Sequence, residues 1–137
     1  MRWKPVVRGS GDARLADIDA ILESLGLQEV ADRKCTDLPL LEQRKIEVAR
    51  AVACGPSLLL LDEPTAGATR AEARELGAEI EALRRNGITI LLVEHNFPFM
   101  MDVCDRIVVL NFGVVVAEGT PVEVKDNATV REIYLGT

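Results

Sequence analysis

The sequence predicts an α/β fold, because segments of helical period alternate with short, strongly apolar runs. The first of these runs holds four consecutive leucines, in SLLLLDEP, between a Gly-Pro break and a proline. Its length favours a strand over a short buried helix, and its composition is typical of a parallel strand buried on both faces. The second run, ITILLVE at 88–94, is predicted to be another buried strand.

Two helices are predicted before the first strand. Residues 1–12 are expected to form an irregular tail, since proline and glycine interrupt them and no apolar period appears. Apolar residues at helical spacing indicate a helix at 13–25, which Gly26 would end, and a second helix at 41–53. In the second helix the apolar stripe is predicted on Ile46, Ala49, Val52 and Ala53, with Arg44, Lys45 and Glu47 off it.

After the first strand the pattern predicts further alternation of helices and strands. The helix at 70–85 should turn Leu76, Ile80 and Leu83 inward and end at Asn86-Gly87. The later elements are expected to be the strand at 88–94, a helix after Pro98, a hairpin of 106–111 and 114–119 around Phe112-Gly113, and one or two short helices at the end. We therefore expect three parts: the tail at 1–12, a helical part at 13–57, and a part at 58–137 that carries the strands.

Composition narrows the class of protein. Hydrophobic residues make up 48% of the chain and charged residues 28%, which is enough apolar material for a core. The net charge of -6 argues against a nucleic-acid partner, which requires a basic surface. No apolar run reaches the ~18 residues of a membrane span, so any membrane link is expected to go through a partner protein. Three cysteines without metal-ligand spacing indicate reduced thiols in a cytoplasmic protein.

Acidic residues at the end of the leucine strand are the first candidates for chemistry. Asp62 and Glu63 follow the strand directly, and His95, the only histidine, follows the second strand. Carboxylates after a strand are common, because strands end in polar turns, so the pair alone is weak evidence. Ligands of open α/β sheets nevertheless bind at the carboxyl ends of the strands, where these three side chains are expected.

The order of these motifs resembles an ABC-transporter ATP-binding subunit. LLLLDEPTAG followed by LLVEHN is similar to the Walker B strand and H-loop of ABC ATPases, and LPLLEQRKIEVARAVACGPSLLLLDEP to the layout from signature helix to Walker B. The segment CDRIVVLNFGVVVAEGTPVEV and the ending YLGT resemble the subfamily that drives import of branched-chain amino acids. The resemblance covers roughly residues 13–137 and implies a partial P-loop NTPase fold, with a mostly parallel sheet and a C-terminal hairpin.

The resemblance implies a role for each site residue. Asp62 would hold Mg²⁺ through water, Glu63 would act as the catalytic base, and His95 would meet the γ-phosphate of ATP. The degenerate signature, which would face the ATP of a second ATPase subunit, is Leu38, Pro39, Leu40, Leu41, Glu42 and Gln43. Leu41 occupies the place of a glycine, which should impair that contact. The further partners implied are membrane permease subunits, at the inner face of the cell membrane.

One half of the nucleotide site has no counterpart in the sequence. No GxxxxGK[ST] loop is present, and Gly9-Ser10-Gly11 and Trp3 are interpreted as tail residues. In the family that the chain resembles, a central P-loop strand lies beside the strand at 88–94. The P-loop strand is therefore expected to be absent here, so the strand at 88–94 would lose this neighbour, and the isolated chain would be marginally stable or paired with another chain. We expect no independent ATP hydrolysis.

Three interpretations remain open on the sequence alone. The chain is a truncated ATP-binding subunit, a non-catalytic module that docks on an intact ATPase or permease, or the product of a non-functional gene fragment. Whether the chain is an enzyme stays undecided among them.

Overall fold

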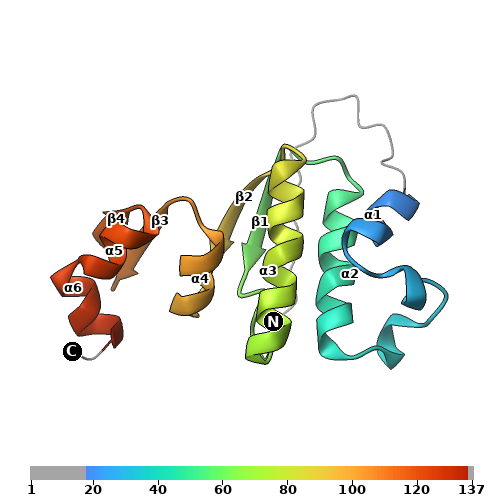
Figure 1. Cartoon of the computed structure of the whole chain (residues 1–137), viewed down its shortest axis with the longest axis horizontal. Coiled ribbons are helices and arrows are strands. Elements are labelled where there is room, and N and C mark those ends of the chain that lie inside the picture. Colours follow the sequence, from blue (N-terminus) through green and yellow to red (C-terminus); the bar gives the residue numbers. More distant parts are fainter. Residues whose placement is uncertain (1–17, 136–137) are drawn as a thin grey trace. The chain divides into compact units, whose positions relative to one another are not determined.

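A computed structural model describes residues 18–135 (Figure 1). The chain divides into two compact units, with the boundary in the sequence between Glu94 and His95. Helices and strands alternate in both units, which confirms the predicted α/β class. The predicted tail, with Trp3 and Gly9-Ser10-Gly11, lies outside the described residues. The division into parts at 1–12, 13–57 and 58–137 stays a prediction.

In the described residues, the first unit holds three α-helices, two short 3-10 helices and a pair of strands. The helix predicted at 70–85 is present with the predicted bounds, and the helix predicted at 41–53 is shifted by one residue. Only 18–24 of the helix predicted at 13–25 is seen, because its beginning lies outside the described residues. The elements are α1 Ile18–Ser24, η1 Gln28–Val30, η2 Cys35–Asp37, α2 Leu40–Val52, β1 Leu58–Asp62, α3 Arg70–Arg85 and β2 Thr89–Val93.

The two strands of this unit run parallel, with Asp62 paired to Val93 at their carboxyl ends. Leu59 and Leu61 are buried on the face of β1 that the helices cover, and α3 is the crossover between β1 and β2 (Figure 1). The prediction that both faces are buried is wrong. Leu58 is 46% exposed, because nothing in the described part of the chain covers the second face of this sheet.

The position of Lys45 also differs from the prediction. It was expected off the apolar stripe of α2, but it is only 3% exposed. Its Nζ donates to Glu75 Oε1 at 2.5 Å and lies 2.6 Å from Glu79 Oε1, and both carboxylates belong to α3. The ion pairs compensate the buried charge and fasten α2 to α3.

The second unit is built on the predicted hairpin. Phe112 and Gly113 both have positive φ, +47° and +80°, as the tight turn between two antiparallel strands requires. The hairpin forms a two-stranded sheet of its own. The buried core of this unit is Ile107 and Val109 of the sheet with Val124 and Val130 of the helices that follow it. The elements are α4 Phe97–Val103, β3 Ile107–Asn111, β4 Val114–Gly119, α5 Pro121–Asp126, α6 Ala128–Val130 and a π-helical turn, η3 Arg131–Leu135.

Among residues 18–135, no helix combines the length and the apolar character that crossing a membrane requires.

Candidate functional site

Two carboxylates lie where β1 ends. Asp62 is the last residue of the strand, and Glu63 begins the loop that follows. The backbone N–H of Glu63 donates to the carbonyl of Val93 at 2.8 Å, so the start of this loop stays attached to β2. Glu63 has φ +46°, a left-handed conformation that costs a side-chain-bearing residue about 1–2 kcal/mol. Both side chains are exposed, at the sheet edge where ligands of open α/β sheets bind.

The loop after the acids is fastened by the carboxylate of the residue that directly follows β2. Glu94 Oε1 accepts hydrogen bonds from the backbone N–H of Thr65 at 2.8 Å and from its hydroxyl at 2.5 Å. Thr65 is buried, so these bonds satisfy polar groups that water does not reach. The sequence analysis did not identify this pair. The signal was present, because residues just after two neighbouring parallel strands meet at one edge of the sheet.

His95 follows Glu94 directly in the chain and opens the second unit. Its side chain is exposed. The next residue, Asn96, caps α4 by accepting a hydrogen bond from the N–H of Phe99 at 3.2 Å. The structure thus brings Asp62, Glu63 and Glu94 to one edge, and the role of His95 stays a prediction.

The degenerate signature spans the beginning of α2. Pro39 occupies the N-cap without a side-chain cap, and the Gln43 amide donates to the carbonyl of Leu38 at 2.7 Å. Leu38 is buried and Leu40 is exposed. Leu41 is 7% exposed and therefore part of the core of this unit. Its predicted correspondence to a glycine of the family stays a prediction.

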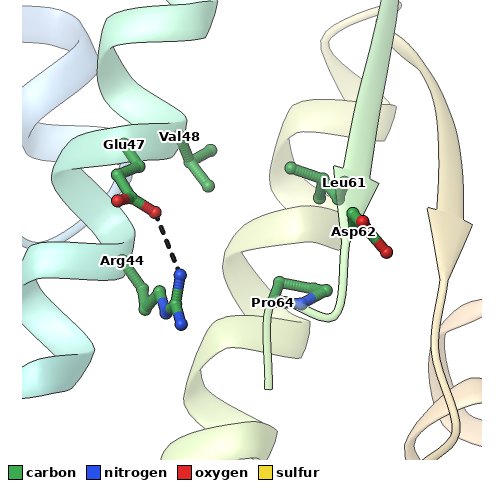
Figure 2. Close-up of a pocket in the computed structure, with 6 residues that line it drawn as sticks. All are labelled: Arg44, Glu47, Val48, Leu61, Asp62 and Pro64. Atoms are coloured by element: carbon green, nitrogen blue, oxygen red, sulfur yellow. Dashed lines mark hydrogen bonds and ion pairs between the residues drawn. The ribbon is translucent and has the colours of Figure 1, made fainter. Parts of the chain in front are cut away.

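A small cleft lies between α2 and the end of β1 (Figure 2). In Figure 2 the side chains of Val48 and Leu61 face one another, and that of Asp62 points away from α2. Arg44 Nη1 pairs with Glu47 Oε2 at 3.2 Å along α2. The residues that line the cleft are Arg44, Glu47, Val48, Leu61, Asp62 and Pro64.

Glu42, in the signature segment, has one carboxylate oxygen that is buried without a hydrogen-bond partner among the described residues. The Nε of Arg44 is in the same condition. Buried polar atoms are nearly always satisfied in folded proteins, so two such atoms within one turn of α2 mark a segment whose polar groups are incompletely paired.

The ligand types near the acidic edge limit how a metal ion could be held. In this part of the chain, no three His, Cys, Asp or Glu residues come together as a ligand set for a metal ion. Mg²⁺ at phosphate sites keeps several waters and takes only one or two carboxylates, the rest of its shell coming from phosphate oxygens. The exposed carboxylate of Asp62 fits that partial role and no larger one.

Family models match the chain in two segments. Residues 4–66 match the model of the ABC transporter, and residues 114–137 match that of the branched-chain amino acid ATP-binding cassette transporter. The first match begins at residue 4, so it includes most of the tail that was expected to lie outside the resemblance. The second match covers the hairpin strand β4 and the C-terminal helices.

Curated proteins and solved structures give the same relationship. The chain is 42% identical over 116 residues to the high-affinity branched-chain amino acid transport ATP-binding protein LivG of Escherichia coli K12. The aligned residues cover 84% of this chain and 46% of LivG. The protein of the same description named BraF, from Pseudomonas aeruginosa, is 41% identical over the same shares of the two chains. A solved ATP-binding cassette of an ABC transporter is 31% identical, with a TM-score of 0.79 over 85% of this chain and 48% of the other.

The chain therefore spans about half the length of the relatives that it matches. Its fold is part of the ABC ATPase fold. Over most of its length, the chain is homologous to ABC transporter ATP-binding proteins of the branched-chain amino acid type.

Proposed function

We propose that the chain supplies the acidic side of an ATP site in an ABC transporter for branched-chain amino acids. One observation carries the proposal. Two parallel strands deliver Asp62, Glu63 and Glu94 to one sheet edge, in a chain 42% identical to LivG. ATP and Mg²⁺ are the ligands that this family implies.

Asp62 and Glu63 take different roles in this proposal. Asp62 lies on the exposed face of β1, where its carboxylate can hold Mg²⁺ through a water molecule. When bound, Mg²⁺ neutralises charge on the β- and γ-phosphates. Glu63 leaves the extended conformation at φ +46°, so we expect its carboxylate to diverge from that of Asp62. It is available there to orient and deprotonate the attacking water.

The other two parts of the proposal concern the γ-phosphate and the partner proteins. His95 would meet the γ-phosphate, since it directly follows the residue that fastens the loop after the acids. Residues 38–43 would face the ATP of a second ATPase subunit, and membrane permease subunits would hold the complex at the inner face of the cell membrane. Hydrolysis requires phosphate-binding groups that GxxxxGK[ST] supplies, and the sequence has none.

A second candidate function rests on that missing motif. The chain would then be a non-catalytic module that docks on an intact ATPase or permease. In this case Asp62 and Glu63 would have no catalytic task, and their substitution would leave transport unchanged.

The test is a chimera in which this chain replaces the matched part of E. coli LivG. In cells that lack LivG, the chimera should restore uptake of labelled leucine, and the Asp62→Asn and Glu63→Gln chimeras should not. Glu29→Gln is the matched control, because Glu29 is an exposed acid in η1. Uptake that survives both site substitutions would contradict the proposal and favour the non-catalytic module.

A further inference from the structure

The loop that begins with Glu63 is made of two successive turns. In the first turn the N–H of Ala66 donates to the carbonyl of Glu63 at 3.1 Å, and Pro64 occupies the second position, where its fixed φ is favourable. In the second turn the N–H of Ala68 donates to the carbonyl of Thr65 at 3.0 Å. Thr65 therefore belongs to both turns, and a contact that fixes Thr65 fixes the path of the whole loop.

Glu94 supplies such a contact from outside the loop. Its Oε1 atom accepts hydrogen bonds from the N–H and the hydroxyl of Thr65, at 2.8 and 2.5 Å. Because Thr65 is only 5% exposed, water cannot take over these bonds if the carboxylate is removed. The preceding residue, Val93, accepts the N–H of Glu63 at 2.8 Å. The last residue of β2 and the one after it thus hold the loop at two points.

A second glutamate–threonine pair in the chain has the same bonds and a different role. Glu123 Oε2 accepts hydrogen bonds from the N–H and the hydroxyl of Thr120, both at 2.8 Å. This pair is local and exposed, and it forms the capping box of α5. The pair of Glu94 and Thr65 instead joins positions 29 residues apart, and Thr65 lies at neither end of a helix. Helix capping therefore does not account for it.

The backbone of Glu63 is in a conformation that has to be held. Its φ of +46° is unfavourable for a residue with a side chain, and such a conformation persists only where the surrounding structure enforces it. The rotamers open to a side chain depend on its φ and ψ, so this conformation also decides where the carboxylate can point. A general base must lie within hydrogen-bond reach of its proton, and a misplacement of about 1 Å can slow a reaction by roughly 100-fold.

We infer that Glu94 is a positioning residue for ATP hydrolysis. Through its two hydrogen bonds to Thr65, it holds Glu63 in the left-handed conformation from which the Glu63 carboxylate reaches the attacking water. The proton of that water passes to Glu63, and Glu94 takes no part in the transfer. The inference rests on the proposed function, in which Glu63 deprotonates the water, and deepens it by naming the residue that aims the base.

The test is single-turnover hydrolysis by the LivG chimera, with enzyme in excess over labelled ATP and the enzyme concentration varied. Glu94→Ala should lower the maximal rate about tenfold or more and leave the half-saturating concentration unchanged, because ATP binding does not depend on the base. Glu94→Gln keeps an acceptor oxygen and should retain most of the rate. Glu123→Ala is the matched control, because it removes the same two bonds from a threonine elsewhere, and it should hydrolyse ATP at the unsubstituted rate.

The effect of Glu94 must pass through Glu63. In a Glu63→Gln chimera no base is left to position, so Glu94→Ala should cause almost no further slowing. An unchanged maximal rate of Glu94→Ala would overturn the inference, and so would a slowing that persists in full in the Glu63→Gln background. Thr65→Val replaces Glu94→Ala if the latter does not fold, since it keeps the shape of the side chain and loses only the hydroxyl bond. An unchanged maximal rate of Thr65→Val would equally overturn the inference.

Failure of the proposed function would give a different result. Hydrolysis by Glu63→Gln at the unsubstituted rate would refute the role of Glu63 as a base. The hold on the loop is measured separately in the full chain by amide hydrogen exchange: Glu94→Ala should speed exchange at the Glu63 and Ala66 amides, and Glu123→Ala should not. Unchanged exchange at both amides would refute the hold, whatever the chimera does.

Discussion

Replacing Lys45 by methionine tests how α2 and α3 are held together. Lys45 Nζ lies 2.6 Å from Glu79 Oε1 and 2.5 Å from Glu75 Oε1. The side chain of Glu75 is 57% exposed, so its pair is screened and contributes below about 1 kcal/mol. The side chain of Glu79 is 12% exposed, and its second oxygen has no hydrogen-bond partner among the described residues. The effect of the substitution therefore comes mainly from Glu79.

Lys45→Met removes the cation and leaves Glu79 buried with an uncompensated charge. Loss of one partner of a buried pair costs about 3–5 kcal/mol, and methionine keeps the apolar stem of the side chain. Lys45→Met combined with Glu79→Leu should recover most of that loss, because no buried charge then remains. The free energy of unfolding is measured by urea titration with circular dichroism. Lys34→Met, at an exposed position of the same unit, is the control.

The effect should depend on pH in a defined direction. Burial raises the pKa of Glu79 above its ordinary value, and the hydrogen bond and charge of Lys45 oppose that rise. A carboxyl whose folded pKa is raised stabilises the fold below its unfolded pKa of 4.5, and this contribution is lost as the pH rises through the folded pKa. Lys45→Met raises the pKa of Glu79 further. The destabilisation should thus be small near pH 4 and complete at pH 7.

Equal costs of Lys45→Met and Lys34→Met at pH 7 would contradict a stabilising role of the buried ion pairs. A double substitution as unstable as Lys45→Met alone would contradict it equally. The second result would mean that the side-chain packing of Lys45, and not the charge left on Glu79, stabilises the fold.

Three further substitutions test local features. Thr69→Ala removes the capping box with Glu72 and should lower the stability of the chain by about 1 kcal/mol in thermal unfolding, whereas Thr69→Ser should retain it. Glu94→Ala leaves the buried N–H and hydroxyl of Thr65 without their acceptor; it should cost about 1–3 kcal/mol and speed hydrogen exchange at the Thr65 amide. Leu41→Gly should destabilise the chain by about 3 kcal/mol or more in urea, because it empties a core position. Equal stability of any of these variants and the unchanged chain would contradict the corresponding contact.

The elements that the sequence predicted well are those whose signals are local. The helix at 70–85 has a regular apolar period and a clear end at Asn86-Gly87, and the structure reproduces its bounds. The hairpin follows from two apolar runs around Phe112-Gly113, and it too is present. The strand-end position of Asp62 followed from four leucines and a proline.

The features that sequence analysis missed depend on contacts between distant residues. Lys45 looked like a solvated charge, because its partners Glu75 and Glu79 are 30 and more residues away in the chain. The hydrogen bonds between Thr65 and Glu94 span 29 residues and have no local pattern. The leucine strand was predicted to be buried on both faces from composition alone, but burial depends on which layers the chain can supply.

The most direct measurement of the central claim is single-turnover hydrolysis of ATP by the purified LivG chimera. With enzyme in excess over labelled ATP and Mg²⁺ present, Glu63→Gln should slow phosphate release by roughly 100-fold or more, the usual contribution of a general base. Binding of ATP, measured in the same samples, should remain. Hydrolysis by Glu63→Gln at the rate of the unsubstituted chimera would show that the carboxylate at the end of β1 does not activate water.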